Sequence, residues 1–374
     1  MANMMDYLDW RGDLSFAQAE FNEVDNLIFS ELVYVDFKGI VPPPGAGGIT
    51  IKEASRIFFL SHTKEEINER VSSTKAAAFL MEKMAKTRRF ADLILSDYIE
   101  EISAREQSQF CAMTVKLDDG SIFVSYSGTD NTMVGWKENF NMSFLSETPG
   151  QLKAVDYLNQ VVSPRQKKIR VGGHSKGGNL SVYASVHCRE SIQNRILGVY
   201  SNDGPGFTES MIHREEYGKM LPKIHTYLPE SSIVGMLLEH EEEYQVVESS
   251  VTGPMQHDAM TWKVMGNSFV HVKTVAKQSV ILDQALKAWV GKMDAAQREN
   301  FVDTLFLVLE EADIKTVDDL ANITFKKFVE LLKLKSSLDK ESQEVLSKTL
   351  QMFLTESNRT VKDFVKMKLE KSDL

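Results

Sequence analysis

A Gly-x-Ser-x-Gly turn at residues 173–177 constrains the fold of this chain more than any other feature. The residues before it, 169–171, favour a strand, and apolar residues recur at helical spacing over 180–184 behind it. A sharp turn from strand to helix holds its serine in a strained backbone conformation and exposes the hydroxyl above the sheet. Glycine is needed at 173 and 177 because a Cβ there would collide across the turn. Ser175 is therefore a candidate nucleophile.

Strand and helix patterns alternate on both sides of this turn. The segments 109–117 and 122–126 alternate like strands and are joined by Asp118-Asp119-Gly120, a hairpin signal. Further patterns indicate a helix near 150–162 and strands at 168–172, 196–201, 223–228 and 244–249. Strands separated by helices predict an α/β fold with a mostly parallel sheet covered by helices, which binds ligands at the carboxyl ends of its strands.

The two ends of the chain have a different character. Residues 1–105 read as largely helical, notably at 23–32 and 64–105. From about residue 270, Gly and Pro become rare and apolar residues recur at helical spacing. We therefore expect an α/β domain over 1–269 and a C-terminal helical extension over 270–374. That extension is more typical of a scaffold or a homo-oligomer surface than of a catalytic part.

Composition excludes several classes of protein. The net charge of −10 argues against nucleic-acid binding. Cys111 and Cys188 form no Cys-x-x-Cys pair, which favours buried thiols in a reducing cytoplasm. Neither a signal-peptide pattern nor a run of about 18 apolar residues occurs, so we expect no membrane insertion. The sequence holds no His-Glu-x-x-His cluster and no phosphate-binding loop, so we expect no metal and no cofactor.

A serine nucleophile needs a base and an acid, which in α/β-hydrolases follow it in the order acid, then histidine. His257 is the best candidate base because its loop follows the last expected strand. His225 lies inside a strand, and His240 lies in the acidic run 239–243, which reads as a solvated helix face. His213 and His271 are the other histidines beyond the nucleophile helix.

We expect Asp203 to be the acid, with Glu230 as the second candidate. Asp203 ends the expected strand at 196–201 and is followed by a Gly-Pro-Gly turn, so its carboxylate can reach His257. Glu230 is the alternative because it follows the next strand, at the more usual place for the acid. Asp258 is adjacent to His257 and is poorly placed to orient it. The competing interpretation is that Asp203 only forms a turn and bonds the backbone of its own loop.

Two backbone donors are expected to form an oxyanion hole. The Lys176 amide directly follows the nucleophile. Thr129, in Ser127-Gly128-Thr129-Asp130, follows the strand at 122–126 and could supply an N–H and its hydroxyl.

Five motifs together resemble those of the bacterial Mbeg-like α/β-hydrolases, which are related to the class 3, fungal-type lipases. They are Tyr-Ser-Gly-Thr-Asp at 126–130, Trp136 to Phe140, Gly-Gly-His-Ser-Lys-Gly-Gly at 172–178, Asp-Gly-Pro-Gly-Phe at 203–207 and Gln-His-Asp-Ala-Met-Thr-Trp at 256–262. The resemblance implies an α/β-hydrolase fold with Ser175 as nucleophile, His257 as base and Thr129 at the oxyanion.

The chain departs from the class 3 lipase pattern at three places. Ser127 stands where those lipases usually have Arg, and Ser231-Ser232 stands near the position of their acid. Lys176 replaces their usual Leu. A lysine there could favour an anionic substrate or could lie at the surface.

These features favour a serine hydrolase that cleaves an acyl or lipid-like ester. A thioesterase, acyltransferase or peptidase would use the same residues, because a fold does not fix the substrate. A non-enzymatic scaffold is the third possibility. Apolar residues in 205–222 and 229–243, such as Phe207, Met211 and Ile212, could form an acyl pocket or lid, or could be core.

Overall fold

The computed structural model describes residues 2–69, 75–103, 105, 108–129, 137–139, 141–142 and 147–276, and then 279, 296–299, 302–303 and 306. Its helices are α1 (Met4–Arg11), α2 (Glu23–Leu32), α3 (Ile51–Ser61), α4 (Lys64–Glu69), α5 (Lys75–Met84), α7 (Pro149–Val161), α8 (Lys176–His187), α9 (Glu190–Gln193), α10 (Glu209–Ile212) and α11 (Glu215–Met220), with short 3₁₀ helices η1 (Leu221–Lys223), η2 (Val234–Met236), η3 (Gly253–His257) and η4 (Ala259–Thr261).

The strands form one large mixed sheet and a small hairpin. The sheet has nine strands in the order β1-β2-β3-β4-β5-β6-β7-β8-β11, and β9 pairs with β10. Strands β4 to β8 run parallel, while the pairs from β1 to β4 and the pair β8–β11 are antiparallel. The bounds are β1 (Gly48–Thr50), β2 (Ile94–Ser103), β3 (Ser108–Lys116), β4 (Ile122–Tyr126), β5 (Ile169–His174), β6 (Ile196–Asn202), β7 (Ile224–Pro229), β8 (Tyr244–Val247), β9 (Val264–Met265), β10 (Ser268–Phe269) and β11 (His271–Val272).

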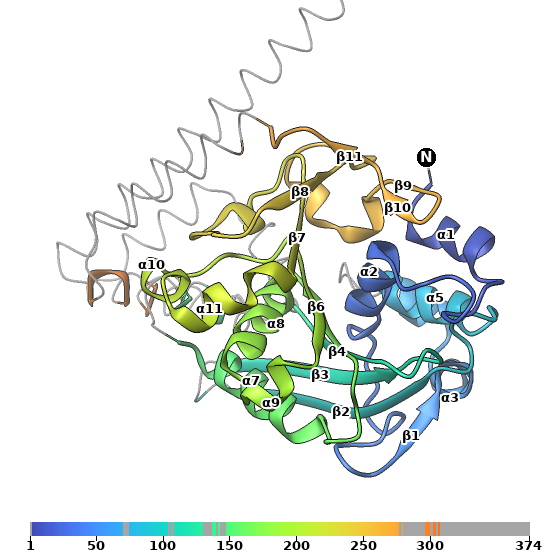
Figure 1. Cartoon of the computed structure of the whole chain (residues 1–374). Helices are drawn as coiled ribbons and strands as arrows, with labels where there is room; N and C mark the ends of the chain where they lie inside the picture. Colours follow the sequence, from blue (N-terminus) through green and yellow to red (C-terminus); the bar gives the residue numbers. More distant parts are fainter. Residues whose placement is uncertain are drawn as a thin grey trace, which may run out of the picture.

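Helices cover both faces of this sheet (Figure 1). Helices α1, α2 and α5 lie on one side, and α7, α8 and α11 lie on the other. Neighbouring residues of β4 divide between the two layers, because Phe123 belongs to the apolar cluster under α2 and Val124 to the cluster under α8. The expected α/β fold with a mostly parallel, helix-covered sheet is confirmed, as are the strands predicted around the Gly-x-Ser-x-Gly turn.

The predicted helix over 64–105 is wrong in its last part, which is β2 and pairs antiparallel with β3. A short apolar run such as 90–95 fits a buried helix and a buried strand equally well. The pairing with the fully buried middle of β3 decides in favour of a strand.

Helix α2 is held firmly against the sheet. Every residue from Val24 to Leu32 is buried. Asp25 accepts two hydrogen bonds from the Arg89 guanidinium, at 2.9 and 2.5 Å, and both side chains are fully buried. The guanidinium also lies 3.8 Å from the centre of the Phe16 ring. This charged pair fixes α2 to the chain that leads into β2.

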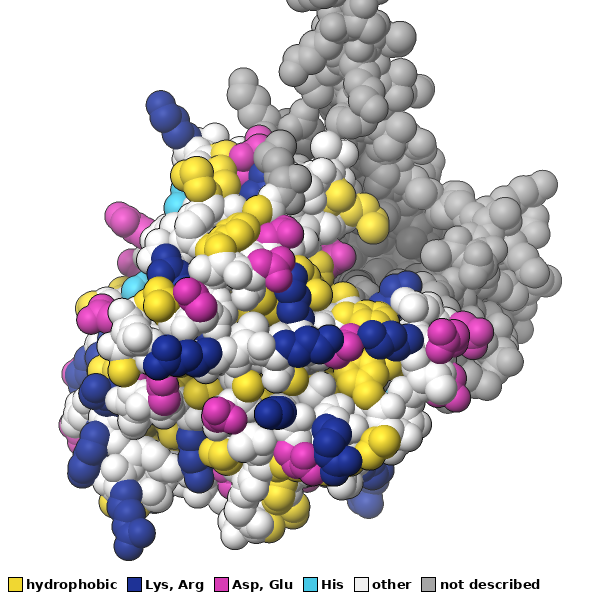
Figure 2. All heavy atoms as spheres, turned by 90° about the vertical axis from the view of Figure 1, so that its right-hand side faces the viewer, with side chains coloured by type: hydrophobic (Ala, Val, Ile, Leu, Met, Phe, Trp, Pro, Cys, Tyr) yellow, Lys and Arg dark blue, Asp and Glu magenta, His cyan; other side chains and the backbone are white. Residues whose placement is uncertain are grey.

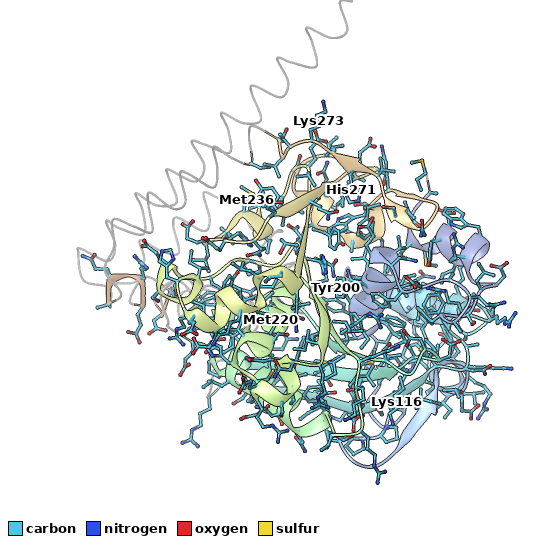
Figure 3. All side chains as sticks on the ribbon, in the orientation of Figure 1. Lys116, Tyr200, Met220, Met236, His271 and Lys273 are labelled. Atoms are coloured by element: carbon cyan, nitrogen blue, oxygen red, sulfur yellow. The ribbon has the colours of Figure 1, made fainter. Side chains whose placement is uncertain are left out.

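The sheet extends slightly past the expected domain boundary at 269/270, because β11 pairs with β8. Met236, His271 and Lys273 lie toward this edge of the molecule (Figure 3). Most of the extension predicted over 270–374 lies outside the described residues, as do Trp136 and Phe140.

The described surface shows no single-signed patch on the face in Figure 2, where basic and acidic side chains are interspersed. Within the part of the chain that the structure describes, no helix combines the length and apolar character needed to cross a bilayer.

Candidate active site

Ser175 lies at a sharp turn between β5 and α8. Its backbone has φ 57° and ψ −130°, which is unusual for a residue with a Cβ. Its N–H donates to the carbonyl of Asn202 at the end of β6, at 2.9 Å. A Cβ on Gly173 would lie 2.4 Å from Gly177, and one on Gly177 would lie 2.1 Å from the Tyr126 carbonyl. Both glycines are therefore required by close backbone approach, as predicted.

A hydrogen-bonded chain links Ser175, His257 and Asp203. Ser175 Oγ lies 3.1 Å from Nε2 of His257, and Nδ1 of that ring lies 2.6 Å from Oδ2 of Asp203. Ser175 and Asp203 are buried, whereas the His257 side chain is 33 % exposed. The geometry requires Nδ1 to donate its proton to the carboxylate, which leaves the Nε2 lone pair facing the serine hydroxyl.

Asp203 is surrounded by donors. Its backbone has φ 49°, and its side chain is completely buried. Oδ1 accepts a hydrogen bond from Ser232 Oγ at 2.5 Å and from the Gly235 N–H at 3.1 Å. The second oxygen faces His257. Three donors suit a carboxylate, because both oxygens that burial removes from water find a partner.

The structure thus brings Asp203, rather than Glu230, to the His257 ring. Glu230 follows β7, and its backbone pairs with Val247 and Ala276. Asp258 caps η4 by accepting from the Met260 N–H at 3.0 Å. Sequence reasoning missed Ser232, which stands close to where class 3 lipases have their acid and here donates to Asp203.

Two further groups are candidates for the oxyanion hole. Lys176 begins α8, so its N–H belongs to the first helical turn and has no partner within the helix. The 127–129 loop packs against the serine, since a Cβ on Gly128 would lie 3.0 Å from Ser175 Cβ. Among the described residues, the buried Thr129 Oγ1 has no hydrogen-bond partner.

The Lys176 side chain is neither near the surface nor available to an anionic substrate, which corrects both sequence-based expectations. The side chain is 1 % exposed, and its ammonium lies 2.8 Å from Oε2 of the fully buried Glu138. It also donates to the Gln109 carbonyl at 2.6 Å. Glu138 accepts from the N–H groups of Gly150 and Gln109, at 2.8 and 3.1 Å. This pair joins β3 and α7 to the start of α8.

A second histidine lies against His257. The rings of His174 and His257 are 4.7 Å apart between centres, and His174 Nε2 lies 2.8 Å from the His257 carbonyl oxygen. Nδ1 of His174 lies 3.2 Å from Oε1 of the buried Glu31, in α2. Burial, more than the neighbouring charge of His257, lowers the pKa of His174 to about 3. Burial and the Asp258 charge raise the pKa of Glu31 to about 8.

The other histidines have structural partners. His225 stacks on Tyr200 with ring centres 5.1 Å apart. His240 does not lie on a solvated helix face, contrary to expectation. Its Nδ1 lies 3.0 Å from the buried Glu242, and its Nε2 lies 2.7 Å from the Gly235 carbonyl. His240 therefore braces the loop that donates to Asp203.

The apolar residues suggested as an acyl pocket lie partly in the core. Phe207, Met211 and Ile212 are buried in the cluster under α8. A groove of about 620 Å³ between α1 and α5 shares no lining residue with the Ser175–His257–Asp203 chain. Met255, two residues before His257, is 69 % exposed. Within the described residues, no three His, Cys, Asp or Glu side chains gather in an arrangement suited to a metal ion.

Sheet order, helical layers and the serine turn define an α/β-hydrolase fold. A family model described as Mbeg1-like matches residues 84–307, and the chain belongs to that family. No curated protein matches the chain. Among solved structures, it is similar to "Crystal structure of M37 lipase", with a TM-score of 0.38 and 15 % identity over 58 % of this chain and 70 % of that one.

Proposed function

We propose that this protein is a serine hydrolase that cleaves a carboxylic, acyl or lipid-like ester through an acyl-enzyme formed on Ser175. The observation that carries the proposal is the continuous hydrogen-bonded chain from Ser175 Oγ through His257 to the buried Asp203. The strained conformation of Ser175 supports it, because such strain persists at sites where a side chain must be held in position for chemistry.

In the proposed mechanism, Ser175 Oγ attacks the ester carbonyl while His257 Nε2 takes the hydroxyl proton. Asp203 keeps His257 in the required tautomer and stabilises the imidazolium. The carbonyl oxygen, now negative, is stabilised by the Lys176 N–H and by Thr129, whose buried hydroxyl has no partner among the described residues. His257 then gives its proton to the departing alcohol. Water, activated by the same imidazole, releases the acid.

The proposal includes a cytoplasmic location, a small-molecule acyl substrate and no cofactor. Two cysteines that are both buried and unpaired support a reducing compartment. The exposed Met255 close to His257 supports an apolar substrate group near the base.

The test is the intact mass of the protein after incubation with a fluorophosphonate probe. We expect one adduct on the wild type and none on Ser175→Ala. Ser185→Ala is the matched control, because Ser185 is also a buried serine of the same chain segment and bonds only within α8. A panel of acyl esters of increasing chain length, with thioester and amide analogues, then defines the bond. A folded wild type that forms no adduct and turns over no ester would overturn the proposal.

A further inference from the structure

Helix α2 contributes polar side chains to the underside of the site, although its residues precede the span that the family model matches. Asn26 exchanges hydrogen bonds with the Asn202 side chain, and Ser30 Oγ accepts one from it. The backbone carbonyl of Asn202 receives the Ser175 N–H. Tyr34, just beyond the helix, accepts from the Gly128 N–H at 2.9 Å and lies 3.2 Å from the His174 carbonyl. The most unusual of these side chains is Glu31, a carboxyl group inside the apolar run 27–33.

The hydrogen-bond pattern fixes where the protons lie. A carbonyl oxygen only accepts, so His174 Nε2 must carry a hydrogen to bond the His257 carbonyl. Nδ1 of the neutral ring is then an acceptor. Two groups face this nitrogen, the Tyr34 hydroxyl at 3.4 Å and Oε1 of Glu31 at 3.2 Å. The single hydrogen of the Tyr34 hydroxyl is directed to the His174 carbonyl oxygen, at 3.2 Å. As a carboxylate, Glu31 would leave Oε1 without a hydrogen-bond partner among the described residues, so a carboxylic O–H is the donor that fits Nδ1.

We propose that Glu31 and His174 are positioning residues for His257: the Glu31 carboxylic acid donates to His174, and His174 donates to the main chain from which the base projects. This inference rests on the proposed function of His257. The pair would fix the His257 carbonyl and, with the ring stacking at 4.7 Å, the plane of its imidazole. Holding a catalytic group within a few tenths of an ångström matters for rate, since a 1 Å misplacement can cost about 10²-fold.

The surroundings of Glu31 favour its neutral form. Burial is the largest cause that raises its pKa to about 8, and the Asp258 charge adds to it. The groups that face the pair are His174 from β5, Asp258 from the segment between η3 and η4, Tyr34 from the end of α2, and His257 with Asp203 behind it. The low pKa of His174, about 3, argues against a charged imidazolium–carboxylate pair at this position.

A specific pH dependence follows. When the pH rises above about 8, Glu31 loses the proton that it donates, and a carboxylate faces the His174 lone pair. The His257 carbonyl then loses a correctly oriented donor. The rate of labelling of Ser175 by the fluorophosphonate should fall about fivefold within one pH unit above this pKa and approach a tenfold loss at higher pH.

Two variants separate positioning from simple packing. Glu31→Gln carries a permanent N–H donor of nearly the same shape, so its labelling rate at pH 7 should stay within about threefold of the wild type and should not fall above pH 8. Glu31→Leu removes the donor, so its labelling should be about tenfold slower at pH 7. Ile28→Val, a buried apolar change on the same helix, should keep the wild-type pH profile.

Two outcomes would overturn the proposed positioning role. One is a labelling rate of Glu31→Gln that falls above pH 8 as the wild-type rate does. The other is a folded Glu31→Leu variant that labels at the wild-type rate. If the folded wild type does not label at all, the proposed function fails instead. Histidine side-chain ¹⁵N spectra then still test whether Glu31 donates to His174. An Nε2–H tautomer of His174 that changes near pH 8 in the wild type but not in Glu31→Gln supports it. An Nδ1–H tautomer, or no change, overturns it.

Discussion

The site contains two histidine–carboxylate pairs that differ in almost every physical respect. Asp203 accepts from Ser232, Gly235 and His257, so both of its carboxylate oxygens are hydrogen-bonded. Among the described residues, the Glu31 carboxyl group has one close polar contact, with Nδ1 of His174. The His257 side chain is one-third exposed, whereas His174 and Glu31 are each less than 10 % exposed. The first pair therefore suits a charged carboxylate, and the second suits a neutral acid.

The difference teaches that a short His–carboxylate distance does not by itself define a catalytic pair. The supply of donors around the carboxylate decides its protonation state, and access to the nucleophile decides which histidine can move a proton. His257 Nε2 faces Ser175, whereas both nitrogens of His174 are occupied by the protein itself.

The same substitution at the two carboxylates should have very unequal effects. Asp203→Asn replaces an acceptor by a donor at Nδ1 of His257 and forces the wrong tautomer, so labelling of Ser175 should slow by about 10⁴-fold. Glu31→Gln keeps a donor toward His174 and should cost no more than about threefold at pH 7. The measurement is the labelling rate of both variants at pH 7, with far-ultraviolet circular dichroism to show that each is folded. Similar losses in the two variants would contradict the distinction.

Glu138 is a third buried carboxylate near the site, and its partners are a lysine and backbone N–H groups instead of a histidine. Glu138→Met leaves the Lys176 ammonium buried without its ionic partner, so the free energy of unfolding should fall by about 3–5 kcal/mol. Urea unfolding measures this loss. Glu138→Met with Lys176→Met should recover part of it, because no unpaired charge remains.

The matched control is Glu215→Gln, which breaks an exposed pair with Lys219 and should leave the urea midpoint unchanged within error. An unfolding free energy of Glu138→Met equal to that of the control variant would show that the buried pair does not stabilise the start of α8.

Thr129 is a buried polar residue of a different kind. Its Oγ1 has no hydrogen-bond partner among the described residues. We propose that this hydroxyl donates only when an oxyanion forms, whereas Glu31 faces His174 at all times. Thr129→Val should slow ester turnover on the order of 10²-fold through kcat, while Thr129→Ser keeps the hydroxyl and most of the rate. Wild-type turnover by the Val variant would leave the backbone N–H as the donor.

Much of this architecture could be predicted from local pattern. The parallel strands and the serine turn follow from alternation, glycine placement and helical spacing, which are local properties. The order of Ser175, Asp203 and His257 along the chain also fits their contact, because carboxyl ends of parallel strands share one edge. The predicted helix over 94–103 failed because a strand there depends on its partner β3.

The supporting residues could not be predicted in the same way. The burial of Lys176 depends on Glu138 from another segment, and motif position alone suggested a surface or substrate-binding role. The contact of Glu31 with His174 depends on how α2 packs against β5. The available signals were a carboxyl group in an apolar helix and a histidine directly before the serine. Neither signal predicts which residue the side chain contacts, because that depends on the tertiary structure.

The final prediction concerns how the free energy of unfolding depends on pH through Glu31. The pKa of Glu31 is raised from 4.5 to about 8 on folding, so the folded state binds one more proton than the unfolded state between these values. Stability from this group is complete below pH 4.5 and is lost as the pH rises to about 8. Glu31→Gln has no such proton. Its unfolding free energy should therefore gain about 1.4 kcal/mol per pH unit relative to the wild type across this window. Urea unfolding of both proteins at pH 5, 6 and 7 measures the gain, and a constant difference would mean that Glu31 is already charged in the folded protein.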